Sequence, residues 1–378
     1  MKIVIFGLTV SSSWGNGHAT LWRGLIKALS RRGHDVTFFE RDVPYYAKHR
    51  DLSELFGGRL ALYSDWNEIL PKARRQLRDA DVGMVTSYCP DAINAAALVL
   101  ESGTCSVFYD LDTPVTLNRL RAGQPVEYIG SRGLQDFGLV LSYTGGTALE
   151  LLKTELGARQ VAPLYGSVDP EVHKPVAPVK MFECDLSYLG TYAEDRQSVL
   201  QDLFIEPARR VPDRKFLIGG AQYPQEFPWA ENIFFARHVA PPDHPAFYSS
   251  SQLTLNITRS AMAQMGYCPS GRLFEAAASG TPMISDWWEG LDEFFEPQSE
   301  ILLSRAAEDV VNILGLSAAE LKKISQAARE RTLAQHTADH RAIDFETAVQ
   351  NAWNHKSAVV SHHGTRSTEH EATLTSAN

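Results

Sequence analysis

The stretch GYCPSGRLFEAAASGTPMISD, residues 266–286, contains a short helix between two turn-forming segments. Ser270 is typical of the residue that precedes a helix, so the helix is expected to begin at Gly271 or Arg272. Most of the residues that follow are small and apolar, which is typical of a helix packed closely on a sheet. Arg272 and Glu275 are the exceptions, and they lie one helical turn apart.

The first turn of this helix is a candidate site for a diphosphate. The backbone N–H groups of Gly271, Arg272 and Leu273 have no partner within the helix, and the positive end of the helix dipole favours an anion. Glu275, one turn further along, could accept hydrogen bonds from two vicinal hydroxyls. A purely structural alternative stays open, because acidic side chains stabilise the first turn of any helix.

Around this stretch, short apolar segments alternate with longer amphipathic ones along the chain. This alternation predicts an α/β fold, in which helices cover both faces of parallel sheets. In the first half the predicted strands are KIVIFG (2–7), DVTFFE (35–40), GMVTS (83–87), CSVFYD (105–110), LVLSY (139–143) and VAPLY (161–165). In the second half they are LSYLG (186–190), KFLIGG (215–220), NIFFA (232–236), LTLNIT (253–258), PMISD (282–286) and EILLS (300–304).

The proline-rich segment 165–180 separates these two series and is typical of an interdomain linker. We therefore expect two Rossmann-like domains, residues 1–168 and 169–355, that face each other across a cleft. The last segment, 356–378, has few core-forming residues, and we expect it to be disordered. Ligands of such sheets bind beyond the carboxyl ends of the strands, so the loops at those ends are the places to look for a site.

The composition limits the partners and the compartment. The 378 residues carry a formal net charge of −9, which argues against a nucleic-acid partner. No apolar run reaches the roughly 20 residues of a membrane span, and the start MKIVIFG reads as a buried strand instead of a signal peptide. These features predict a cytoplasmic protein without a transmembrane segment. The four cysteines lack metal-binding spacing and are expected to be buried thiols.

The loop after the first predicted strand contains three glycines that do not have the spacing of the dinucleotide fingerprint. Glu40 could serve as the acidic partner in that fingerprint, so a nicotinamide enzyme is disfavoured without being excluded. Gly15 and Gly17 allow the backbone to approach a ligand closely. His18 is a candidate contact to substrate, and its alternative role is to pack or cap its own helix.

Acidic residues follow the strand CSVF. Asp110 and Asp112 are placed to grip substrate hydroxyls or to act as a base, and Asp112 and Thr113 are candidate cleft residues. The alternative is a turn and a helix cap, which Asp before Thr-Pro also forms well.

Four polar or glycine positions follow strands of the second half. Gly190 ends one predicted strand, and Arg196 follows in the next helical segment, from which it could reach a phosphate. Asn256 and Arg259 stand at the end of another strand, directly before residues 266–286. A solvent-facing arginine is the alternative for Arg196.

Three segments together resemble one known family. They are YGSVDPEVHKP between the domains, YLGTYAEDRQ at the start of the second domain and GYCPSGRLFEAAASGTPMISDWWEGLDEFFEP, 266–297. The chain resembles GT-B glycosyltransferases, and among them the spore-maturation (CgeB-like) group of the glycosyl transferases group 1 class. The resemblance covers nearly all of the chain before the tail. It implies that the first domain binds the acceptor, that the second binds a nucleotide-diphospho-sugar, and that the final helix often crosses back to the first domain.

The resemblance also assigns roles to residues. It implies that Glu275 holds the nucleotide ribose, that 270–273 cradles the diphosphate, and that Arg196 faces the same group. Asp286, Glu289 and Tyr267 are implied neighbours of the donor. The full set of predicted donor residues is Gly190, Arg196, Asn256, Arg259, Tyr267, Ser270, Gly271, Arg272, Leu273, Glu275, Asp286 and Glu289.

One departure concerns Tyr267, because retaining relatives usually carry a glutamate there, with seven residues between it and the second glutamate. The usual grip on the sugar hydroxyls is therefore weakened, and the transferred sugar stays undetermined. The CgeB-like group commonly has this tyrosine. Domain closure is expected to bring His18 and Asp112, the candidate catalytic residues, over the sugar.

The reaction expected from the resemblance is transfer from a UDP-sugar, or from a dTDP- or GDP-sugar, with retention and to an unidentified acceptor. We expect neither a metal nor a permanently bound cofactor, since no D-x-D follows a strand in the second half and the one at 110–112 lies in the acceptor domain. Two alternatives stay open: an epimerase of the UDP-N-acetylglucosamine type, which would use Asp110, Asp112 and Glu289, and a binding subunit without turnover. The oligomeric state is left open.

Overall fold

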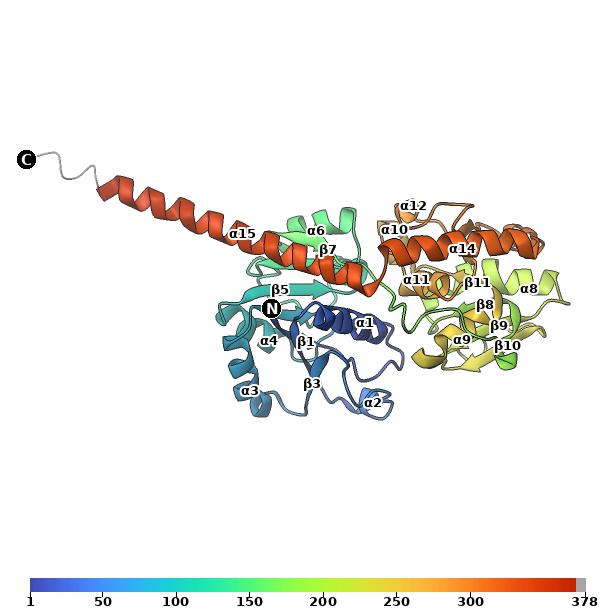
Figure 1. Ribbon diagram of the computed structural model, residues 1–378, viewed down its shortest axis with the longest axis horizontal. Helices are drawn as coiled ribbons and strands as arrows, with labels where there is room; N and C mark the ends of the chain where they lie inside the picture. The colour runs from blue at the N-terminus through green and yellow to red at the C-terminus, as the bar shows by residue number, and fades with distance from the viewer. Residues whose placement is uncertain (372–378) are drawn as a thin grey trace, which may run out of the picture.

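The structure, a computed structural model, describes the backbone of residues 1–371 and the side chains of residues 1–355. Two parallel sheets form two domains that lie side by side (Figure 1). The first sheet has seven strands in the order β3 (Gly58–Tyr63), β2 (Asp35–Arg41), β1 (Lys2–Gly7), β4 (Val82–Thr86), β5 (Cys105–Asp110), β6 (Leu139–Ser142) and β7 (Val161–Pro163).

The second sheet has six strands, again all parallel. Their order is β10 (Ile233–Arg237), β9 (Phe216–Gly220), β8 (Cys184–Leu189), β11 (Ser251–Asn256), β12 (Met283–Ser285) and β13 (Leu302–Leu303). The predicted α/β class with two parallel-sheet domains is confirmed. All four cysteines are buried, as expected.

Among the strands of the described residues, β3 is the one that we did not predict. It lies at the edge of the first sheet and pairs only with β2, for example Val36 with Gly58. Its apolar run is only four residues long, Leu60 to Tyr63 after Arg59, and Leu62 in this run is exposed. Edge strands need to bury only part of their side chains, so their hydrophobic signal is weak.

Each sheet separates two hydrophobic cores. On β1, Ile3 and Ile5 join one core while Val4 and Phe6 join the other, as the two-residue repeat of a strand requires. The helices of the first domain are α1 (His18–Arg31), α2 (Pro44–Ala47), α3 (Trp66–Arg78), α4 (Ala92–Glu101), α5 (Thr113–Arg121) and α6 (Thr147–Leu156).

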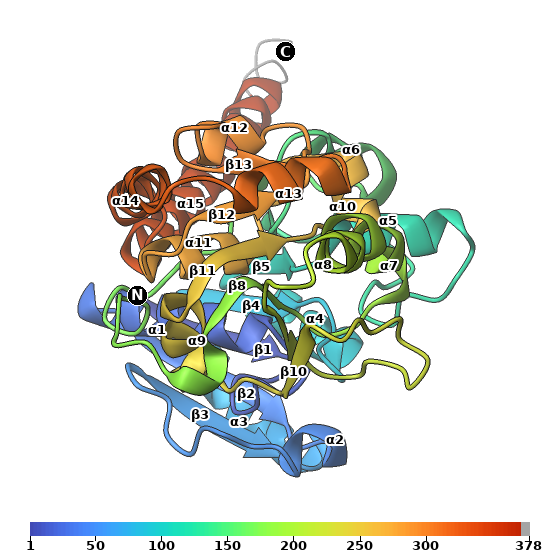
Figure 2. The same ribbon diagram turned by 90° about the vertical axis from the view of Figure 1, so that its right-hand side faces the viewer.

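In the second domain, α9 and α11 contribute to one core, α8 and α13 contribute to the other, and α14 contributes to both. Figure 2 shows how these helices are arranged around the sheet. This arrangement holds α11 against β11 and β12, with its first turn at the carboxyl end of the sheet. The helices are α7 (Gln197–Leu200), α8 (Glu206–Arg210), α9 (His244–Ser249), α10 (Ser260–Met265), α11 (Gly271–Ala278), α12 (Leu291–Phe294), α13 (Ala307–Leu314) and α14 (Ala318–Gln335).

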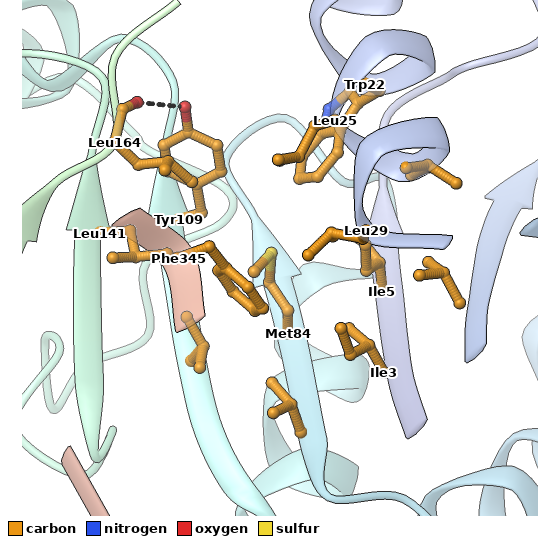
Figure 3. Close-up of a cluster of buried hydrophobic side chains, with 14 of the residues drawn as sticks. Ile3, Ile5, Trp22, Leu25, Leu29, Met84, Tyr109, Leu141, Leu164 and Phe345 are labelled. Carbon is orange, nitrogen blue, oxygen red and sulfur yellow. Dashed lines mark hydrogen bonds between the residues drawn. The ribbon is translucent and has the colours of Figure 1, made fainter. Parts of the chain in front are cut away.

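The last helix, α15 (Ala338–Glu371), returns to the first domain and packs on α1, β5 and β6 (Figure 1). Its Phe345 is buried in the first domain among Met84, Tyr109 and Leu141 (Figure 3). We expected a disordered tail from residue 356 onwards. The structure differs from that expectation, because the backbone of 356–371 continues as helix. Helical backbone satisfies its own hydrogen bonds, so it does not require core-forming side chains. Residues 372–378 lie outside the described residues. Within the described part, no helix is both long and apolar enough to cross a membrane.

His336, in the turn between α14 and α15, is expected to make stability depend on pH. It is buried, its Nε2 donates to the Phe294 carbonyl (3.3 Å) and its Nδ1 accepts from Arg341 (3.0 Å). Burial and the Arg341 guanidinium lower the pKa of His336 to about 3.

The unfolded chain therefore binds a proton near pH 6.5, where folded His336 stays neutral, and stability falls as the pH decreases from 6.5 towards 3. The expected loss is about 1.4 kcal/mol for each pH unit below 6.5. Urea unfolding at pH 7.0 and 5.5 measures it, and His336→Gln should show a smaller decline between the two. An equal decline in both proteins would contradict the assignment.

Candidate functional site

A cavity of about 340 Å³ lies between the two domains at the carboxyl ends of both sheets. Loops that follow β1 and β5 line one wall, and loops that follow β8 and β11 line the other together with the first turn of α11. The predicted residues that line it are Gly15, Gly17, His18, Asp112, Gly190, Arg196, Arg259, Ser270, Gly271, Arg272 and Glu275. Fold topology therefore brings together residues that are up to 260 positions apart in the chain.

The start of α11 opens onto this cavity. Ser270 has extended backbone (φ −63°, ψ 139°), and no side chain caps the helix. Gly271 and Arg272 line the cavity, so the positive end of this helix is available to an anion. Leu273 differs from the prediction, because its side chain is buried in the core and its N–H donates to the Ser270 carbonyl (3.0 Å).

Three contacts fix the guanidinium of Arg272 at this helix start. Its Nε donates to the Leu189 carbonyl, and its Nη1 donates to Asn256 Oδ1 (2.9 Å). The guanidinium lies over the Tyr188 ring, 5.2 Å from the ring centroid, a cation–π arrangement. Asn256 itself is buried outside the cavity lining, so it positions Arg272 instead of facing a ligand.

Two further arginines lie on the same wall. Arg196 donates from Nη1 to the Tyr188 hydroxyl (3.0 Å), and its Nε has no hydrogen-bond partner among the described residues. Arg259 is paired through Nε with Asp195 (3.1 Å). With Arg272, they give the wall three cationic groups, which suits a ligand with more than one negative charge.

Glycines bring backbone close to this wall. A Cβ on Gly190 would lie 3.1 Å from Arg272 Nη2, and one on Gly220 would lie 2.0 Å from the Gly190 carbonyl oxygen. Gly220 also has a φ of +156°. Larger residues would therefore push the loops after β8 and β9 apart or cover the Arg272 guanidinium.

Glu275 lies deeper along α11, where it is 8 % exposed. Its Oε2 is 3.0 Å from His244 Nδ1, and its Oε1 is 3.8 Å from His173 Nε2. Burial acts to raise the pKa of Glu275, but His173, His244 and Arg272 outweigh it and leave the pKa below its ordinary value. Glu275 is therefore a buried carboxylate that stays charged at neutral pH. Sequence reasoning missed both histidines, which come from distant segments.

On the opposite wall, His18 begins α1, and its backbone N–H donates to Asn16 Oδ1 (3.1 Å). Its ring lies 6.5 Å from the rings of Tyr88 and Tyr143. Asp112 also lines the cavity and accepts a hydrogen bond from the Tyr88 hydroxyl (2.9 Å). Tyr88, which we did not predict, has a φ of +64°, an uncommon conformation for a tyrosine. His18 and Asp112 thus face the arginine wall across the cavity.

Asp110 and Thr113 differ from the expectation that they line the cleft, because both are fully buried beneath it. Asp110 accepts from the Asp112 N–H (3.1 Å) and the Thr116 hydroxyl (3.1 Å), so it shapes the loop. Burial raises the pKa of Asp110 to about 6. Thr113 shares a hydrogen bond with Ser142 (2.8 Å).

Three predicted donor residues also lie outside the cavity lining. Tyr267 has a φ of +47°, accepts from the Gly145 N–H (2.9 Å) through its carbonyl and so links the two domains. Asp286 accepts from the Thr258 N–H (3.1 Å) and holds the loop after β11. Glu289 is exposed. We predicted that these three residues contact the donor directly. In the structure they lie around the cavity and do not line it.

Glu40 has a structural role. It is buried and accepts from the Val10 N–H (2.8 Å), the Ser11 N–H (3.0 Å) and the Thr9 hydroxyl (2.8 Å). Both of its oxygens are used to hold the loop after β1, which removes the acidic partner that a dinucleotide site would require.

Comparison with known proteins agrees with this geometry. Residues 196–347 match the family described as glycosyl transferase-like, a range that contains Arg196, Arg272 and Glu275. No curated protein sequence matches the chain.

Among solved structures, sucrose-phosphate synthase from Thermosynechococcus elongatus is similar at 15 % identity and a TM-score of 0.70, over 94 % of this chain and 99 % of that one. HepE from Anabaena, in complex with UDP and glucose, is similar at 13 % identity and a TM-score of 0.67, over 93 % of this chain and 100 % of that one. An alpha-glucosyltransferase in complex with UDP and DNA has 14 % identity and a TM-score of 0.65, over 93 % and 99 %. The similarity extends over both domains, and the predicted GT-B fold is confirmed.

Proposed function

We propose that the protein is a glycosyltransferase that moves a sugar from a nucleotide-diphospho-sugar to an acceptor bound by the first domain. The observation that carries this proposal is that the first two turns of α11 present Arg272 and Glu275 to one cavity between the domains. The cation at the helix start suits the diphosphate, and the carboxylate one turn later suits the ribose hydroxyls. The match of residues 196–347 to a glycosyl transferase-like family supports the assignment.

The proposed mechanism is electrostatic. As the bond between sugar and diphosphate breaks, negative charge develops on the leaving group, and fixed cationic groups stabilise that charge. Arg272 is already held by Leu189 and Asn256, so little reorganisation is needed when the charge appears. Arg196 and the α11 N-terminus contribute to the same charge. His18 and Asp112 lie on the acceptor side of the cavity, where they can orient an attacking hydroxyl.

We favour UDP as the nucleotide. Structures of similar fold contain UDP or UDP-glucose, in HepE and in the alpha-glucosyltransferase. That second structure also contains DNA, but a net charge of −9 disfavours a nucleic-acid acceptor for this chain. We place the enzyme in the cytoplasm and in the CgeB-like group, on the basis of the three sequence segments.

We also propose transfer with retention and without a metal ion. Retention rests on the family resemblance. The D-x-D at 110–112 follows a strand and is the one that we considered as a metal-binding sequence. Asp110 is buried below the cavity, while Asp112 lines it. The two carboxylates therefore do not face one ligand together. The same observation disfavours an epimerase, since Asp110 and the exposed Glu289 lie outside the cavity lining.

A thermal-shift screen with UDP, GDP, dTDP and ADP tests the donor site. A nucleotide at 100 times its Kd stabilises the folded protein by about 2.7 kcal/mol. We expect UDP to raise the Tm by several degrees and Glu275→Ala to remove most of that shift. Release of free sugar from UDP-glucose, with no epimerised product, would then separate a transferase from an epimerase. If none of the four nucleotides raises the Tm, the proposed donor site is wrong, and binding without any turnover would favour a silent subunit.

A further inference from the structure

The environment of Glu275 has a feature that nucleotide binding alone does not explain. His244 begins α9, and both of its ring nitrogens face oxygen acceptors. Nδ1 is 3.0 Å from Glu275 Oε2, and Nε2 is 3.3 Å from the Val239 carbonyl oxygen. The Glu275 carboxylate can only accept a hydrogen bond, so His244 Nδ1 donates to it. The geometry therefore makes His244 a direct donor to Glu275.

His173 closes the other side of the carboxylate. It belongs to the linker segment between the domains, its side chain is 2 % exposed, and its Nε2 is 3.8 Å from Glu275 Oε1. Burial lowers the pKa of His173, so this second imidazole is neutral at physiological pH. Glu275 thus lies between two histidines, and Nδ1 of His244 is the nearer ring nitrogen.

A buried carboxylate needs a partner, because an unpaired charge in an apolar environment is costly. Without His244, Glu275 would have to bind a proton or turn away from the core, and either change would remove an acceptor oxygen from the cavity. Arg272 also favours the ionised form, but its Nε and Nη1 are used by Leu189 and Asn256. His244 is therefore the side chain that donates directly to the carboxylate.

We propose that His244 is a positioning residue of the donor site, which holds Glu275 ionised and oriented towards the 2′- and 3′-hydroxyls of the donor ribose, with His173 confining the carboxylate from the linker. This inference rests on the proposed function. It gives the site a preference for a ribonucleotide over a 2′-deoxyribonucleotide, because a deoxyribose leaves one oxygen of the fixed carboxylate without its hydroxyl.

The test compares UDP with 2′-deoxy-UDP by isothermal titration calorimetry. A hydrogen bond to a charged group is expected to make UDP bind about tenfold or more tightly than 2′-deoxy-UDP in the unchanged protein. His244→Leu should reduce this ratio to less than about threefold, mainly by weakening UDP binding. His244→Asn, which keeps a donor at the place of Nδ1, should retain part of the ratio. General damage to the site would instead weaken both ligands together.

A double variant shows whether His244 acts through Glu275. In the Glu275→Gln background, His244→Leu should cause no further change in the ratio, whereas independent effects of the two substitutions would overturn the proposal. His336→Gln is the histidine control, since His336 is buried and its ring nitrogens bond to groups outside the cavity. We expect it to keep the full ratio.

A cation is the competing explanation, because ligand atoms of His173, His244 and Glu275 lie within 4.8 Å of one another. One equivalent of tightly bound zinc in the purified protein, with a fall in Tm after chelation, would overturn the proposed role of His244.

The proposed donor site and the proposed role of His244 fail in different ways. If the unchanged protein binds neither nucleotide, the donor site itself is wrong, and if it prefers UDP but His244→Leu keeps that preference, only the role of His244 is wrong.

Discussion

Arg272→Ala will lower kcat/KM for transfer or hydrolysis of the nucleotide sugar by about 10²- to 10³-fold, which is the size of effect seen when one preorganised charge-stabilising donor is removed. The guanidinium is fixed by Leu189, Asn256 and the face of Tyr188, so its charge is in place before the reaction begins. Alanine removes the charge and all three contacts. We expect most of the loss in kcat, because charge on the diphosphate increases as the sugar leaves.

Two further variants separate charge from geometry. Arg272→Lys keeps a positive charge but cannot donate to Leu189 and Asn256 in the same planar arrangement, so it should restore little activity. Arg329→Ala is the control, because Arg329 also bonds through Nε to a backbone carbonyl, that of Ala278 at the other end of α11. It should leave kcat/KM within about threefold. Steady-state kinetics measures all three, and near-normal activity of Arg272→Ala would show that the α11 N-terminus does not hold the leaving group.

The sequence predicted this part of the site because one short helix carries it. Arg272 and Glu275 are three positions apart, and their relation depends only on helical geometry, which is local. The partners of these residues are not local. Asn256 reaches Arg272 from the neighbouring strand β11, and His244 and His173 reach Glu275 from α9 and from the linker. No spacing rule connects such segments, so their contacts required the structure.

The acidic residues show a second limit. A carboxylate at the end of a strand can point into the cleft or beneath it, and the strand repeat does not continue into the loop. Asp112 lines the cavity while Asp110, two residues earlier, is buried and supports the loop. Asp286 likewise supports the loop after β11. The pattern of acids after strands therefore predicted the correct edge of each sheet without the orientation of each side chain.

At the level of the fold, hydrophobic runs predicted twelve of the thirteen strands found in residues 1–371 and missed the edge strand β3. The pattern of 338–353 does not by itself predict which domain α15 packs on, because an amphipathic helix needs an apolar surface but does not specify which one. In the structure that surface belongs to the first domain. The seam between α1 and α15 also contains ion pairs, such as Arg32 with Glu346 (2.7 Å).

Phe345→Ala is therefore expected to destabilise the first domain, although Phe345 lies within 169–355, the range predicted for the second domain. The side chain is 1 % exposed in the core that also contains Met84, Tyr109 and Leu141 (Figure 3). Removing a buried phenylalanine side chain costs about 3–5 kcal/mol of unfolding free energy, part of it from the cavity that remains. Urea unfolding and hydrogen exchange should show the loss, with reduced protection in β4, β5 and β6.

Ile343→Ala provides the matched control on the same helix, because Ile343 is 44 % exposed. Its substitution should change the unfolding free energy by about 0.5 kcal/mol or less, as is usual for surface positions. The contrast between the two variants separates loss of packing from loss of helix propensity, since both end with alanine. If Phe345→Ala instead reduced protection in β8, β11 and β12, or if both variants had the same small effect, α15 would not stabilise the first domain. A large effect confined to the first domain would show that the end of the chain completes that core and thereby ties the two walls of the cavity together.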